Sequence, residues 1–314
     1  MNKQMQKFVT VSPRIGAAIA CGRPVVALET TLLTHGLPYP QNLSTAQAVE
    51  KLVREEGAEP AHIALLNGKI VVGLSEEELA YISHGGPAIP TAGCSELPQL
   101  LAGGKDASLA ADAVLHLAAA CGIDVVAAAG IDGMLRGTAG GLQPSADLRE
   151  LAKAPLLLVC SGFRSILDDE AGRDQLAASG VQLLGYDCAT LPGYYCRSGK
   201  AAVDVQADTP QQAAELRFHQ QALGLGATML ANPAPLSSAM EEAQLESAVR
   251  QALAAAQRQG ISGKAVTPFL LEWIRSFTGG RSLQLSIELL YNNAKLAAQV
   301  AAALAEMQTK LLTE

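Results

Sequence analysis

Short apolar runs recur along most of the chain, and amphipathic segments separate them. Each run is continuous rather than alternating, which is typical of strands buried on both faces of a sheet. The runs cover residues 25–28, 63–66, 70–72, 125–129, 156–159, 181–184 and 228–230. Alternation of such strands with helices predicts the α/β fold class, with a three-layer α/β/α sandwich around a central sheet. Asn67-Gly68, between two of the runs, indicates a hairpin, so we expect the sheet to be mixed.

Serine residues mark the starts of several predicted helices. Ser44 and Ser75 are each followed three residues later by Gln or Glu, as in a capping box, and Ser145 precedes a third helical segment. The longest helical patterns cover residues 241–259 and 282–310. Residues 185–208 are less regular, and we expect them to pass over the active site. Because no Pro-, Gly- or Ser-rich linker divides the chain, we predict a single domain over residues 1–314.

Net charge and composition restrict the kind of partner. The formal net charge is -7 and no basic run occurs, so nucleic acid is not an expected partner. The apolar runs are too short to span a membrane, and the N-terminus lacks the long apolar region of a signal peptide. We therefore expect a cytoplasmic protein. A small anionic substrate stays compatible with this charge, since a few local cations or helix N-termini can bind one.

The six cysteines include no CxxC pair, and most of them lie in apolar surroundings. These features are typical of buried, reduced thiols in a cytosolic protein. From the cysteine spacing we do not expect a zinc site.

Ligands of α/β proteins gather at the carboxyl ends of the strands, so polar residues that follow the apolar runs are the candidates. They are Glu29, Asp132, Arg136, Ser161, Arg164, Asp187 and Asn232. Glu29 is the strongest, because a carboxylate at the end of a buried strand tends to have a perturbed pKa and can carry protons. The structural alternative is that Glu29 accepts hydrogen bonds from backbone N–H groups of the following loop.

Four other residues admit both a structural and a functional interpretation. Asp147, in the first turn of a predicted helix, either meets the helix dipole or holds Mg²⁺ or Mn²⁺ mostly through water. Asn292 and Asn293 lie within an apolar helical pattern and need hydrogen-bond partners, which a substrate or the protein can supply. His35, in a Pro/Gly loop, fits a structural role better than a catalytic one.

Several segments together resemble the pseudouridine-5'-phosphate glycosidase family, also called the indigoidine synthase A-like family. The segments are ALETTLLTHGLPYPQN, NGKIVVGLSEEEL, SADLRELA, VCSGFRSILD, ANPAP, GKAVTPFLL, TGGRSL and NNAKLAA, in the family's order and spacing. The resemblance implies a homotrimer of α/β/α subunits with a manganese-assisted site near the subunit interface. The implied reaction joins or splits the C–C glycosidic bond between uracil and ribose 5-phosphate.

Two of the family's site residues carry over to this chain. The resemblance implies that a lysine amine attacks C1 of the sugar to give a ring-opened Schiff base, while a glutamate at the first strand moves protons. That glutamate matches Glu29. The family's metal-anchoring aspartate, in the SADL segment, matches Asp147, so the resemblance implies Mn²⁺ as a cofactor.

The chain departs from the family at other site positions. The Schiff-base lysine lies in AGAKSILD, and the matching residue here is Arg164, whose guanidinium stays protonated and cannot act as an amine nucleophile. The second active-site lysine matches Thr91, and the adjacent arginines match Cys94 and Ser95. The family's covalent mechanism therefore cannot operate as written, and Lys105, in a glycine-rich loop, offers a substitute amine.

We assign catalysis to Glu29 and Arg164 and the metal to Asp147. Substrate binding is assigned to Thr91, Arg136, Ser145 and Asn292.

The first hypothesis is a pseudouridine-5'-phosphate glycosidase-like enzyme that cleaves or forms the bond between a nucleobase and ribose 5-phosphate without a lysine adduct, with Glu29 as general base for direct attack by water. The second is a catalytically silent or substrate-diverged paralogue that binds a sugar phosphate or a partner protein. A third, a synthase that forms a C-glycoside in secondary metabolism, ranks lower because it faces the same missing lysine.

Overall fold

The computed structural model describes residues 3–134, 144–164, 168–261 and 266–313. An eleven-stranded mixed sheet has the main order β1-β4-β3-β2-β7-β8-β11-β9-β10, and β6 and β5 extend from β3. The strands are β1 (Val9–Val11), β2 (Val25–Leu28), β3 (Glu59–Leu66), β4 (Lys69–Val72), β5 (Thr91–Ala92), β6 (Ala107–Leu109), β7 (Val125–Ala127), β8 (Leu157–Cys160), β9 (Gln182–Tyr186), β10 (Val205–Ala207) and β11 (Thr228–Ala231). The helices are α1 (Pro13–Ala20), α2 (Gln41–Glu55), α3 (Glu76–Gly85), α4 (Leu97–Ala102), α5 (Ala111–Cys121), α6 (Ala146–Leu151), α7 (Asp169–Ala178), α8 (Pro210–Ala222), α9 (Glu242–Arg258), α10 (Val266–Phe277) and α11 (Arg281–Thr313), with short helical turns η1 (Met5–Lys7), η2 (Leu32–Gly36) and η3 (Gly86–Ala88).

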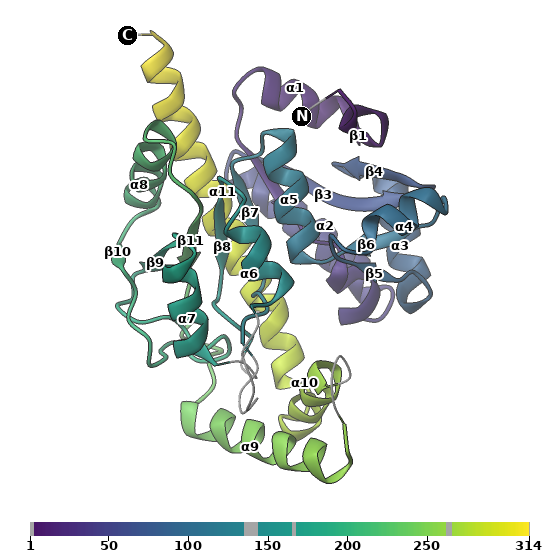
Figure 1. Cartoon of the computed structure of the whole chain (residues 1–314), viewed down its shortest axis with the longest axis vertical. Helices are drawn as coiled ribbons and strands as arrows, with labels where there is room; N and C mark the ends of the chain where they lie inside the picture. Colours follow the sequence, from purple (N-terminus) through teal and green to yellow (C-terminus); the bar gives the residue numbers. More distant parts are fainter. Residues whose placement is uncertain (1–2, 135–143, 165–167, 262–265, 314) are drawn as a thin grey trace.

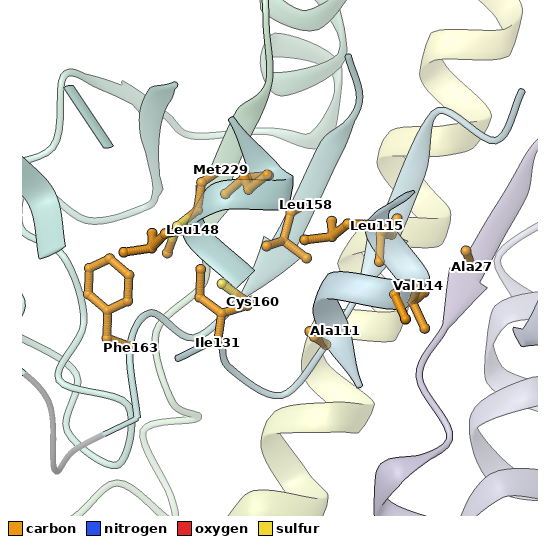
Figure 2. Packing of buried hydrophobic residues seen from close by; sticks show 14 of the residues in the cluster. Ala27, Ala111, Val114, Leu115, Ile131, Leu148, Leu158, Cys160, Phe163 and Met229 are labelled. Carbon is orange, nitrogen blue, oxygen red and sulfur yellow. The ribbon is translucent and has the colours of Figure 1, made fainter. Parts of the chain in front are cut away.

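Helices cover both faces of the sheet, and the strands supply side chains to both sides (Figure 1). In β8, Leu158 and Cys160 enter the core formed with α5 and α6, whereas Leu157 and Val159 enter the core formed with α8 and α11. Figure 2 shows part of the first core. Burial on both sides explains why the runs are continuous instead of alternating. The predicted three-layer α/β/α sandwich around a mixed sheet is confirmed.

The predicted hairpin joins β3 to β4. Asn67 (φ 51°) and Gly68 (φ 68°) both adopt the left-handed backbone conformation that a two-residue turn of this kind requires. A Cβ on Gly68 would lie 2.7 Å from the Cα atom of Gly104, so space also requires glycine there. Strands β3 and β4 pair antiparallel, while β2, β7, β8, β11 and β9 pair in parallel, so that their carboxyl ends share one edge.

Two of the three predicted helix starts are correct. Ser75 Oγ accepts the N–H of Glu78 at 3.2 Å, and the Glu78 carboxylate accepts the N–H of Ser75 at 2.8 Å, which completes a capping box. Ser145 Oγ accepts the N–H of the third residue of α6 at 3.2 Å. No helix within the described residues combines the length and the apolar character needed to cross a membrane.

The predicted helix start at Ser44 is wrong. Helix α2 begins at Gln41, and Ser44 lies inside its first turn. The earlier start is fixed by Asn42, which is fully buried and donates to the carbonyls of Leu33 (2.5 Å) and Ser83 (2.7 Å). A buried amide with two carbonyl partners outweighs the local capping preference of an exposed serine.

Asn293 of α11 fastens the carboxyl ends of three parallel strands. Its side chain is fully buried, and its Nδ2 donates to the carbonyls of Ala128 (2.9 Å) and Ala129 (3.2 Å), which follow β7. Its Oδ1 accepts from Nδ2 of Asn232, after β11, at 3.0 Å. Its Nδ2 also lies 3.0 Å from Oγ of Ser161, after β8. One amide therefore fixes the edge of the sheet at which the candidate site residues lie.

The two neighbouring asparagines provide a matched test of this role. Asn293→Ala is expected to lower the free energy of unfolding by about 2–4 kcal/mol, because it leaves buried carbonyl and amide groups without partners. Asn292→Ala is expected to cost about 1 kcal/mol or less, because Asn292 is partly exposed and, among the described residues, makes one hydrogen bond, to the Pro233 carbonyl at 3.1 Å. Urea unfolding of both variants measures the difference, and equal losses would contradict the assignment.

Candidate active site

Several predicted residues meet at the carboxyl edge of the parallel strands. Glu29 directly follows β2, Arg164 follows β8, and Asp147 lies in the first turn of α6. Asp132, which follows β7, lies among them and contacts both Asp147 and Arg164. The pattern of polar residues after apolar runs thus placed Glu29, Asp132 and Arg164 at this edge, whereas Asp147 was predicted from its position at a helix start, and Asp132 had received no role.

Asp147 is held by backbone N–H groups from two other segments. Its side chain is buried, Oδ1 accepts the N–H of Asp112 at the start of α5 (3.0 Å), and Oδ2 accepts the N–H of Asp132 (2.7 Å). Ser145 Oγ donates to the Asp132 carbonyl at 2.5 Å. Burial, and to a smaller extent the Asp132 carboxylate, raise the pKa of Asp147, Arg164 opposes the rise, and the pKa is about 7 as a result. Ser145, predicted to bind substrate, thus helps to position the loop after β7.

Arg164 forms an ion pair at the centre of the cluster. Its Nη1 lies 2.7 Å from Asp132 Oδ1. Burial opposes the charge of the guanidinium, but the carboxylates of Asp132 and Glu29 and the neighbouring Tyr194 together raise the pKa of Arg164 above its usual range. The guanidinium therefore stays charged, and a charged guanidinium is a group that can bind an anion.

Glu29 has the perturbed carboxyl that its sequence position predicts. Burial raises its pKa, while Arg164 and a hydrogen bond from the Ala129 N–H oppose the rise. Ala129 belongs to the loop after β7, not to the loop that follows Glu29. A carboxyl with a raised pKa exchanges its proton closer to neutral pH, which suits general acid–base catalysis.

The irregular segment after β9 reaches this cluster through Tyr194. Tyr194 is buried, has a left-handed backbone (φ 62°), and packs against the loop after β7. A Cβ on Gly130 would lie 2.4 Å from the Tyr194 ring, so glycine is required for this close packing. Burial raises the pKa of Tyr194, while the Arg164 guanidinium lowers it. Nothing in the sequence pattern pointed to this tyrosine.

Thr91 belongs to a second polar group beside the loop that follows Glu29. Its Oγ1 lies 2.9 Å from Ser108 Oγ and 3.0 Å from His35 Nδ1. Thr34 Oγ1 lies 2.7 Å from Ser108 Oγ and 2.8 Å from His35 Nδ1. His35 thus has the structural partners that were expected of it. The group joins β5 and β6 to the loop after β2.

Of the other two residues predicted to bind substrate, Asn292 contacts the protein itself and Arg136 lies outside the described residues. Asn292 donates to the Pro233 carbonyl, in the loop that follows β11, and its neighbour Asn293 makes the buried bonds to the strand ends. Asp112, which sequence reasoning missed, is buried and holds Asp147 through its N–H group.

Comparisons with known proteins agree on one family. The model of the family "Indigoidine synthase A like protein" matches residues 14–303. The chain is 42% identical over 299 residues to the pseudouridine-5'-phosphate glycosidase of Hahella chejuensis, covering 95% of this chain and 99% of the relative. It is 39% identical over 296 residues to the enzyme of the same name from Escherichia coli, covering 94% of this chain and 95% of the relative.

Solved structures give the same result. The prealnumycin C-glycosynthase AlnA, in complex with ribulose 5-phosphate, superposes with a TM-score of 0.90 at 32% identity, covering 97% of this chain and 99% of AlnA. An indigoidine synthase A-like protein from Thermotoga maritima superposes with a TM-score of 0.83 at 30% identity, covering 95% of this chain and 97% of that one.

The raised pKa of Asp147 predicts how stability depends on pH in the metal-free protein. Its folded pKa, about 7, lies above the ordinary value of 3.8, so the folded state binds the extra proton between these values. Stability is therefore expected to fall as pH rises from about 4 to about 7, by on the order of 4 kcal/mol, and to level off above that. Asp147→Asn should flatten this part of the profile.

Urea unfolding midpoints between pH 4.5 and 8, with a chelator present, measure the slope. The exposed Asp174→Asn serves as control and should keep the wild-type slope. An identical slope in Asp147→Asn and the wild type would show that another group carries the pH dependence.

Proposed function

The chain belongs to the indigoidine synthase A-like family, and we propose that it breaks or forms the bond between C1 of a ribose 5-phosphate unit and a nucleobase or a related ring. Its relatives at about 40% identity are pseudouridine-5'-phosphate glycosidases, and the similar C-glycosynthase holds ribulose 5-phosphate. The observation that carries the proposal is Glu29, a carboxyl of raised pKa at the end of β2 that is under the electrostatic influence of the charged Arg164.

Glu29 is the proton-transfer residue in this proposal. In its ionised form it takes a proton from the water that attacks C1, and in its protonated form it donates to the departing ring. An N-glycosidic bond breaks through an oxocarbenium-like state that needs no covalent adduct, and carboxylates nearby stabilise the developing positive charge. The site thus favours a ribosyl phosphate from which the nucleobase, or a related ring, departs without formation of a Schiff base.

Arg164 binds in this scheme and does not attack. A guanidinium keeps its proton and is no nucleophile at C1, in contrast to the lysine that the family resemblance places there. Its ion pair with Asp132 uses one Nη, and the other donors suit phosphate or carboxylate oxygens. Arg164 therefore positions an anionic part of the substrate.

The residues present also fit a manganese ion at Asp147. Each oxygen of Asp147 receives one N–H bond and keeps acceptor capacity, and oxygen ligands are those that Mn²⁺ prefers. The carboxylates of Glu29, Asp132 and Asp147 all act electrostatically on the Arg164 guanidinium, so a cation near them lowers the cost of their charge. When bound, the metal supplies positive charge and a more acidic water.

We also propose a cytoplasmic homotrimer, on the family resemblance.

A second candidate is a paralogue that binds a sugar phosphate without turnover. It is supported by two residues, Arg164 and Thr91, which stand where the family resemblance places lysines. The chain therefore lacks the amine groups of both lysines. Both candidates bind the same class of ligand, and a turnover assay distinguishes them.

Glu29→Gln is expected to lower the rate of uracil release from pseudouridine 5'-phosphate by at least about 10²- to 10⁴-fold, because the amide cannot carry a proton. Chromatography of free uracil, with and without added Mn²⁺, measures the effect. Full activity in the variant would remove Glu29 from the mechanism. Absence of uracil release in the wild type, together with binding of ribose 5-phosphate, would favour the silent paralogue or a different base.

Arg164→Lys is expected to restore an adduct with ribose 5-phosphate that borohydride reduction traps, since an amine can attack the aldehyde carbon. Trapping should increase from about pH 7 to about pH 9, because Asp132 stabilises the protonated amine. Mass spectrometry detects the adduct, and the wild type and Arg164→Met serve as controls. No adduct at any pH would show that the pocket differs from the family's beyond this one position.

A further inference from the structure

Three metal-binding side chains from distant parts of the sequence meet beside α5. Cys94 lies in the turn after β5, His116 lies on α5, and Glu150 lies on α6, which packs against α5 (Figure 1). A sulfur, a ring nitrogen and a carboxylate oxygen of these residues all lie within 4.8 Å of one another. Elsewhere in the described part of the chain, no other three such side chains meet in this way. We name this group the Cys94 cluster.

We propose that Cys94, His116 and Glu150 form a zinc site. Zinc takes thiolate, imidazole and carboxylate ligands, and a site with three protein ligands keeps its fourth position for water. Bond lengths of about 2.0–2.3 Å place the ligand atoms of a tetrahedral zinc about 3.5 Å apart. His116 Nδ1 and Glu150 Oε2 already lie 3.4 Å apart, so small side-chain movements complete the set. The His116 side chain is 52% exposed, which gives the ion access from solvent.

The surroundings hold the cluster in place and leave its donor atoms available. The N–H of Cys94 donates to Asp112 Oδ2 at 2.8 Å, and its thiol donates to the Asp112 carbonyl at 3.5 Å. Zinc replaces the thiol proton, while the backbone bond persists. Glu150 Oε1 pairs with Lys153 Nζ at 2.6 Å, which leaves Oε2 on the side of His116. One oxygen of Glu150 thus binds zinc without loss of the lysine contact.

The cluster is connected to the candidate active site in two ways, since Glu150 lies one turn after Asp147 on α6 and Asp112 contacts both groups. Asp112 holds Cys94 with its carboxylate and donates its own N–H to Asp147 at 3.0 Å. A zinc ion that orders Cys94 therefore also orders the residue that orients Asp147. The zinc site does not depend on the proposed reaction, because none of its ligands takes part in it.

Zinc binding to the chelator-treated protein tests the proposal. Calorimetry and competition with a chromophoric chelator are expected to give one Zn²⁺ per chain in Asp147→Asn, which lacks the metal aspartate of the candidate active site. His116→Gln should weaken binding by more than about 100-fold, since loss of an outer-shell partner alone costs about 10- to 100-fold. Cys21→Ser, which removes an exposed free thiol elsewhere, is the matched control and should bind like the wild type. Wild-type affinity in His116→Gln would overturn the assignment.

Two further readouts depend on the thiol. Co²⁺ should give thiolate-to-metal charge-transfer absorption that Cys94→Ser abolishes and Cys21→Ser retains. Zn²⁺ should protect Cys94 from iodoacetamide, as peptide mass spectrometry detects, and Mn²⁺ should not. Alkylation of Cys94 at the same rate with and without saturating Zn²⁺ would refute the site, whatever the folding of the Cys94→Ser variant.

Discussion

A single buried carboxylate, that of Asp147, joins three segments on which the candidate site depends. It accepts one N–H from the start of α5 and one from the loop after β7, and it lies itself in the first turn of α6. These segments come from different parts of the chain, and the carboxylate fixes their relative positions. The cost is a buried charge, which is why the pKa of Asp147 is raised. The bonds from Asp112 and Asp132 and the nearby Arg164 offset that cost without removing it.

The balance of charges among Glu29, Asp132, Asp147 and Arg164 then determines what the candidate active site can do chemically. Arg164 is a permanent cation among carboxylates, so it can hold an anion but cannot exchange a proton at neutral pH. Glu29 has the opposite property, because burial brings its pKa closer to neutral pH. In the proposed function, proton transfer and anion binding thus belong to different side chains. The ion pair between Arg164 and Asp132, which is partly exposed, orients the guanidinium more than it stabilises the fold.

Local sequence signals predicted the frame of the site but not all of its contacts. Glu29 after β2 and the hairpin at Asn67-Gly68 follow from burial pattern and turn chemistry, which act over a few residues. Adjacent asparagines on a helix differ in direction by about 100°, since an α-helix has 3.6 residues per turn, so sequence alone could not show that Asn293 is the buried partner and Asn292 the half-exposed one. Tyr194 is positioned by a left-handed backbone in an irregular segment, and no periodicity reports such a conformation. The prediction of a single domain stays a prediction.

The Cys94 cluster was not predicted either, because it also depends on contacts between distant segments. A zinc ion there would change the charge of the candidate active site. Its ligands meet only because α5 packs on α6 and because Asp112 ties the turn after β5 to α5, whereas zinc motifs are recognised by short spacing. The resemblance places a lysine at Thr91 and arginines at Cys94 and Ser95, so this chain has three fewer positive charges there. Zinc brings two positive charges and displaces one thiol proton, a net gain of one. A zinc ion at the cluster would therefore recover part of the positive charge near Asp147 that the substitutions removed.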